Sequence, residues 1–78
     1  MTAKIYIVHA QWDAATATWA TNGEDIPGLV CETTTLEELI EVIRDVAPDL
    51  LRDNLGMRSG QTVDIIVLAE RQVACIAA

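Results

Sequence analysis

Basic residues are scarce in this 78-residue chain, which has five lysines and arginines against twelve acidic residues and a net charge of −7. Direct contact with nucleic acid depends on clustered Lys and Arg side chains. The five basic residues are scattered here: Lys4, Arg44, Arg52, Arg58 and Arg71. The composition therefore argues against direct binding of DNA or RNA.

Cysteine and histidine are rare as well. Cys31 and Cys75 are far apart, and His9 is the one histidine. This spacing fits neither a disulfide framework nor a zinc site. We expect both thiols to be reduced, buried small hydrophobes in strands, and we expect no metal and no other cofactor.

Long apolar runs are also lacking. No stretch approaches the ~20 apolar residues of a membrane span, and the N-terminus has no apolar run of signal length. We therefore expect a cytoplasmic protein without a membrane partner. A glycine-rich phosphate loop is lacking too.

The aromatic residues are Tyr6, Trp12 and Trp19 only, so the core must consist of Ile, Leu, Val and Ala. Yet 51% of the residues are hydrophobic, which is more than a small single core readily holds. The excess indicates apolar surface that is buried against another chain. We expect a homo-oligomer.

The acidic residues are concentrated in the middle of the chain. Residues 21–55 hold nine acids and two arginines, a balance of −7, while the remainder is balanced. Two interpretations are open. The charge either keeps a helix face solvated, or it forms an electrostatic docking face for a basic protein.

Residues 4–12 are rich in β-branched and aromatic side chains, which predicts a strand with apolar residues on both faces. A turn at 13–16 leads into a second strand at 17–21. Trp12 and Trp19 flank this turn and are expected to lie near each other across a hairpin.

A loop is predicted at residues 22–28, because Pro27 fixes its φ angle and Gly28 tolerates a left-handed turn. Residues 29–32 then form a short third strand.

A helix is predicted to begin after Thr35, whose hydroxyl caps it while Glu38 completes a capping box. Its apolar stripe has three- and four-residue spacings: Leu36, Leu39, Ile40, Ile43, Ala47, Leu50 and Leu51. A kink or restart is expected at Pro48. Gly56 marks the end of the helix.

Residues 62–73 read as a last strand, which returns parallel to an earlier strand after the helical crossover. The fold class is α+β in the order β-β-β-α-β: an antiparallel three-stranded meander, one helix on one sheet face, and a fourth strand. Residues 1–78 form a single domain. We expect the opposite, apolar sheet face to be covered by another subunit.

Two runs at this spacing carry a family resemblance: Asp-Ile-Pro-Gly-Leu-Val at 25–30 and Thr-Leu-Glu-Glu-Leu at 35–39. Together with the Trp-Asp turn and the closing apolar strand, they resemble the HicB-like antitoxins over residues 4–73. The likeness is greatest to short single-domain relatives, known as domain of unknown function 1902.

This resemblance implies a truncated ribonuclease-H-like fold without nuclease activity. It also implies that the chain neutralises a small basic toxin of the HicA type, which cleaves mRNA. Many members carry a second, C-terminal DNA-binding domain. No such domain follows the last strand here, so operator binding is not expected.

An enzymatic role is not expected. The strand predicted around His9 holds no carboxylate, since Asp13 falls at its turn, so it lacks the acids of a metal-dependent nuclease. A nucleophilic pair of Cys31 and His9 would need adjacent strands, and it has no evident third group to orient it.

The sequence thus predicts a small acidic protein-binding module. The expected contact residues are Glu24, Asp25, Glu37, Glu41 and Asp45, with Trp12 and Trp19 as apolar anchors. As an antitoxin, the module would mask the RNA-binding surface of its toxin with carboxylates. The alternative is an orphan homo-oligomeric domain with a regulatory or ligand-binding role and no toxin partner.

Overall fold

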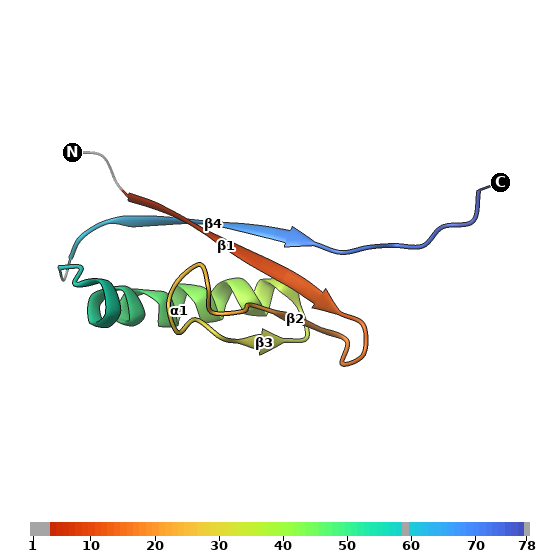
Figure 1. The fold of residues 1–78 in the computed structure, drawn as a ribbon, viewed down its shortest axis with the longest axis horizontal. Helices are drawn as coiled ribbons and strands as arrows, with labels where there is room; N and C mark the ends of the chain where they lie inside the picture. Colours follow the sequence, from red (N-terminus) through yellow and green to blue (C-terminus); the bar gives the residue numbers. More distant parts are fainter. Residues whose placement is uncertain (1–3, 59, 78) are drawn as a thin grey trace.

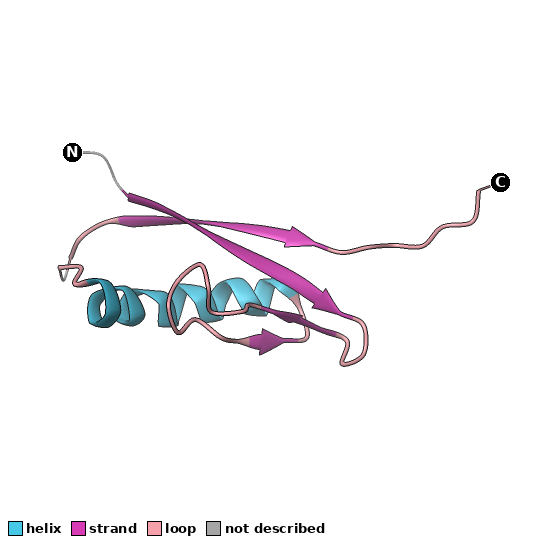
Figure 2. Cartoon of the chain, viewed as in Figure 1, coloured by secondary structure: helices cyan, strands magenta, loops and turns pink. Residues whose placement is uncertain are grey.

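The structure is a computed structural model that describes residues 4–58 and 60–77. Its elements are, in chain order, β1 (Lys4–Asp13), β2 (Thr18–Ala20), β3 (Glu32–Thr33), α1 (Leu36–Leu55) and β4 (Val63–Glu70). The strands form one sheet in the order β3-β2-β1-β4, and α1 lies on one face of it (Figure 1, Figure 2). The predicted α+β class and element order are confirmed.

β1 is the long central strand. It pairs antiparallel with β2 and parallel with β4, while β2 pairs antiparallel with β3. The parallel partner arises because α1 carries the chain back across the sheet before β4 begins. The predicted parallel placement of the last strand is therefore confirmed.

The core lies between the sheet and α1. Side chains alternate across a strand and recur every three to four residues on a helix, so each element presents one apolar face. The loop between β2 and β3 adds two more apolar side chains. The buried set is Val8, Ala10, Ile26, Leu29, Leu39, Ile43, Ala47 and Leu51.

α1 begins and ends where the sequence predicts. The Thr35 hydroxyl accepts a hydrogen bond from the backbone N–H of Glu38 at 3.1 Å, and Gly56 closes the helix in the left-handed region, with φ +67°. Of the kink or restart predicted at Pro48, the restart is wrong, since α1 is one continuous element. Pro48 lies on the exposed side, and the buried stripe from Leu39 to Leu51 continues past it.

The third strand is shorter than predicted, because the chain turns sharply at residues 26–30. The Thr21 N–H donates to the Cys31 carbonyl at 3.0 Å, and the buried Thr21 hydroxyl also holds this stretch. It donates to the Leu29 carbonyl at 2.7 Å and accepts from the Cys31 N–H at 3.1 Å. Only Glu32–Thr33 then pairs with β2.

The last strand is also shorter than predicted, since its final partner in β1 is Gln11, opposite Glu70. β1 continues toward β2 from there, so residues 71–77 have no strand beside them (Figure 1). Cys75 is exposed on this segment, and the prediction that it is buried is wrong. Cys31 is partly buried, and both thiols are free.

Candidate functional site

The outer face of α1 carries a row of carboxylates. Glu37, Glu41 and Asp45 follow one another at four-residue spacing and are all exposed. This spacing places them on one side of the helix, away from the buried stripe. None of the three forms an ion pair within residues 4–58 and 60–77. We call this row the acidic stripe.

Asp49 continues the acidic stripe by one further turn, although sequence analysis did not single it out. Its carboxylate accepts a hydrogen bond from the Arg52 guanidinium at 2.8 Å, so part of its charge is compensated. The uncompensated charge is therefore greatest in the first half of α1. There it also lies near the positive end of the helix dipole.

Asp25 is not on the helix but in the loop after β2. Its carboxylate accepts hydrogen bonds from the His9 backbone N–H at 2.7 Å and from His9 Nδ1 at 3.0 Å. These bonds, above all the backbone one, lower the pKa of Asp25 below its ordinary value of 3.8. Asp25 thus accepts the hydrogen bond of the His9 N–H, which lies outside the part of β1 that pairs with β2.

Glu24 lies next to Asp25 and is exposed, with its backbone N–H donating to Asn22 Oδ1 at 2.9 Å. The structure therefore divides the predicted acidic set. Glu37, Glu41 and Asp45 share one helix face, Glu24 projects from a loop, and the Asp25 carboxylate is engaged by His9.

Trp12 and Trp19 form the predicted pair across the hairpin. They are register partners, and their ring centroids are 5.5 Å apart with the rings at 62°, an edge-to-face contact. The Arg71 guanidinium lies 4.1 Å from the Trp12 ring centroid. Both indoles are only partly buried, so they retain surface for a further contact.

His9 and Cys31, which would need adjacent strands to form a nucleophilic pair, are not neighbours in the sheet. β2 lies between β1, which carries His9, and the stretch that leads from Cys31 into β3. The Cys31 sulfur is instead 3.4 Å from the Thr21 hydroxyl. In the part of the chain that the structure describes, no three His, Cys, Asp or Glu side chains gather as metal ligands.

The sheet face opposite α1 is open and apolar. Ile5 and Ile7 of β1, with Ile66 and Leu68 of β4, are exposed there. Ile7 is the register partner of Ile66, so the side chains of the two strands adjoin. This open sheet face is the one on which the sequence predicts another subunit.

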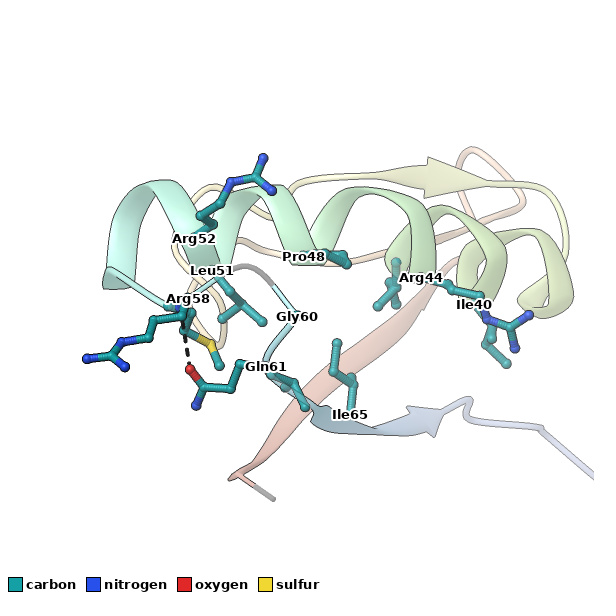
Figure 3. A pocket seen from close by; sticks show the side chains of 12 residues that line it. Ile40, Arg44, Pro48, Leu51, Arg52, Arg58, Gly60, Gln61 and Ile65 are labelled. Atoms are coloured by element: carbon teal, nitrogen blue, oxygen red, sulfur yellow. Dashed lines mark hydrogen bonds between the residues drawn. The ribbon is translucent and has the colours of Figure 1, made fainter. Parts of the chain in front are cut away.

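A cavity of about 400 Å³ separates one flank of α1 from β4 (Figure 3). Apolar side chains of both elements line it, among them Ile40, Val63 and Ile65. Arg52 and Arg58 border it with their guanidinium groups turned away from it (Figure 3). The sequence does not predict this cavity, because its helix side combines apolar-stripe residues such as Ile40 and Ile43 with Arg44, Pro48 and Arg52.

No helix among the described residues has the length and apolar character that a bilayer span requires. No curated protein is significantly similar to the chain. A solved structure, the hypothetical protein TTHA1013 from the extremely thermophilic bacterium Thermus thermophilus, is 32% identical with a TM-score of 0.75. The match covers 92% of this chain and all of that one.

A protein-family comparison matches residues 5–77. This match spans nearly the whole sheet, α1 and the segment after β4. The chain belongs to the family described as domain of unknown function DUF1902.

Proposed function

We propose that this chain is a small acidic protein-binding module that docks a basic partner protein on the outer face of α1. The observation that carries this proposal is the acidic stripe. Its three carboxylates are exposed, evenly spaced on a rigid helix, and free of ion pairs among the described residues. Such an arrangement accelerates association with a basic surface and selects against acidic partners.

The resemblance to HicB-like antitoxins gives this proposal a specific form. The partner is then a small basic toxin of the HicA type, and both proteins are cytoplasmic. Carboxylates on α1 take the place of RNA phosphates on the toxin and exclude its substrate. No chemical step by the antitoxin is required, since inhibition is electrostatic and steric.

The other predicted contact residues contribute unequally to this proposal. Glu24 adds an exposed carboxylate, and the partly buried indoles of Trp12 and Trp19 serve as apolar anchors. Asp25 contributes least to direct contact, because His9 already engages its Oδ2.

The test begins with affinity capture of the tagged full chain from its host and mass spectrometry of the retained proteins. A basic protein in near-equal amount is then titrated with the variant Glu37→Lys/Glu41→Lys. We expect its affinity to fall at least about tenfold, because two attractive charges become repulsive. The thermal midpoint of the variant should change little, since both positions are exposed.

The matched control is Asp53→Lys/Glu70→Lys, which changes the net charge equally at two exposed positions outside the acidic stripe. It should retain most of the affinity. Equal affinities of both double variants and the parent chain would contradict docking on the acidic stripe.

A second candidate function is a homo-oligomeric domain without a toxin partner, and the open sheet face favours it. Ile7 on β1 and its register partner Ile66 on the edge strand β4 are each 46% exposed, and adjoining exposed isoleucines of this kind mark an interaction surface. Recovery of the protein alone from its host, as an oligomer that Ile7→Asp dissociates, would support this candidate.

A further inference from the structure

The segment 71–77 continues β4 but leaves the body of the protein (Figure 1). Every residue in it is exposed, including Val73 at 69% and Ile76 at 99%. No charged side chain follows Arg71 within it, and no hydrogen bond joins residues 72–77 to the rest of the described chain. Beyond Arg71 this extended segment is uncharged, and nothing in the described part of its own chain covers its apolar side chains.

β4 provides a surface that such a segment can join. It is the last strand of the sheet, and only its β1 side is paired among the described residues. Its eight residues include no proline and no lysine, and its charged residues, Asp64 and Glu70, stand near its two ends. The outer backbone groups of Val63–Glu70 therefore form a template for one more strand.

The cavity beside α1 opens next to this template. α1 packs closest to β2 and β3, which leaves the helix-facing side chains of β4 incompletely covered. Val63 and Ile65 on β4, together with Ile40 and Pro48 on the helix flank, line the resulting space of about 400 Å³. A strand added to the edge of β4 would place every second side chain over this cavity.

We propose that segment 71–77 of one chain pairs antiparallel with β4 of a second copy and inserts Val73 into the cavity between α1 and β4 of that copy. In a symmetric antiparallel pair, two residues that face each other lie equally far along the chain from the residue at the centre. If Leu68 is at the centre, Val73 of one copy faces Val63 of the other. Opposite residues share a sheet face. Val73 thus projects to the side on which α1 and the cavity lie.

A second copy is the occupant because each chain carries both halves of the contact. With a two-fold axis, each copy places its segment 71–77 on β4 of the other, and the assembly closes as a dimer. We call this arrangement the exchange. The segment cannot fill its own cavity, because it leaves β4 at the end opposite to Val63 (Figure 1). The exchange uses neither the acidic stripe nor the open sheet face, so it stands or falls independently of the functions proposed above.

The first test is sedimentation equilibrium of the full chain and of two single variants. Val73→Lys places a charge in the cavity and should weaken the dimer at least about 100-fold. Gln72→Lys, one position earlier, faces the other side and should change the dissociation constant less than about threefold. Both positions are exposed in the single chain, so neither substitution should alter its fold.

The second test uses Cys75 as a native reporter. Its thiol is exposed in the single chain and becomes covered in the exchanged dimer, whereas Cys31 is partly buried in both. The reaction of Cys75 with a thiol reagent should slow as protein concentration rises through the dimerisation range. Val73→Lys should restore the fast reaction at all concentrations.

A mixing experiment tests reciprocity. Ile40→Lys blocks the cavity but leaves the segment intact, whereas Val73→Lys blocks the segment but leaves the cavity intact. Each variant alone should be monomeric, and the mixture should associate more tightly than either, because one of the two contacts is restored.

Three results would overturn the proposal. One is a monomeric parent chain at about 100 µM, a concentration at which a micromolar pair is mostly associated. The second is an oligomer in which Cys75 reacts as fast as in the monomer and on which Val73→Lys has no effect. That result would place the interface on the open sheet face instead. The third is protection of Cys75 only after a different protein is added, which would assign the cavity to that protein.

Discussion

At the β2–β3 end of the sheet, side chains bond backbone groups that no strand pairs, whereas the outer backbone groups of β4 have no such partner among the described residues. The Thr21 hydroxyl and the Asp25 carboxylate replace the missing ladder bonds beside β2, and Ile26 and Leu29 are buried there. β4 has an unpaired outer edge among the described residues, exposed isoleucine and leucine on one face, and a cavity beside the other.

This difference shows how a chain of 78 residues divides its apolar content. At the β2–β3 end, the side chains of Thr21 and Asp25 bond backbone groups that a strand would otherwise pair. The other end keeps the features of an internal sheet position, where a further strand would normally follow. Ile5 and Ile7 of β1 adjoin Ile66 and Leu68 of β4 as an exposed apolar group, while Val30 is exposed singly at the β2–β3 end. An adjoining group of this kind is typical of a surface that binds a polypeptide.

The largest expected effect compares one isoleucine from each end. Ile26→Ala removes a side chain that is 1% exposed and should lower the free energy of unfolding by about 2–4 kcal/mol. Ile66→Ala removes one that is 46% exposed and should cost less than about 1 kcal/mol in the monomer. Urea unfolding at low protein concentration measures both, and equal losses would contradict the contrast between the two ends.

A smaller effect is expected for the hydroxyl that replaces the ladder near β2. Thr21→Val keeps the shape but leaves the Cys31 N–H without its acceptor, at a cost of about 1–3 kcal/mol in unfolding free energy. The matched control is Thr34→Val at an exposed threonine, which should change stability by less than about 0.5 kcal/mol. A loss at residue 21 no greater than at residue 34 would exclude a structural role for this hydroxyl.

The smallest effect is a dependence of stability on pH through Asp25. Because folding lowers its pKa below 3.8, Asp25 stabilises the fold at pH values above 3.8. This contribution is lost as the pH falls through the lower, folded value. Asp25→Asn should remove it, at a cost of about 1 kcal/mol or less near neutral pH, since the side chain is partly exposed.

Chemical unfolding of the parent chain and Asp25→Asn at several pH values checks this expectation. The difference between them should shrink as the pH falls below 3.8. Glu24→Gln, at the neighbouring exposed carboxylate, serves as the control. A difference that grows toward acid pH would contradict the role assigned to Asp25.

Much of this fold could be predicted from local patterns. The Thr35 cap, the Gly56 stop and the tryptophan pair depend on residues close in sequence, and each lies as predicted. The restart at Pro48 was wrong because tertiary packing of both helix halves outweighs the local cost of proline.

The remaining features depend on contacts between distant residues. Asp25 meets His9 across 16 positions, a pairing that no local spacing indicates. The cavity exists because α1 packs toward β2 and β3 rather than β4, which is a property of the layers and not of any motif. β4 ends at Glu70 because its last partner on β1 is Gln11. The apolar pattern of the sequence continues to Val73, so it predicts a strand that is too long.

The most direct test of the account is amide hydrogen exchange of the full chain, followed residue by residue by NMR at low and high protein concentration. Every second amide of β4 points to its outer edge. We predict that these amides and those of segment 71–77 exchange rapidly in dilute protein and become protected at high concentration, while β1 and α1 are protected throughout. Rapid exchange of the outer β4 amides at every concentration, in the chain alone and with any captured partner, would contradict the claim that another polypeptide completes this end of the sheet.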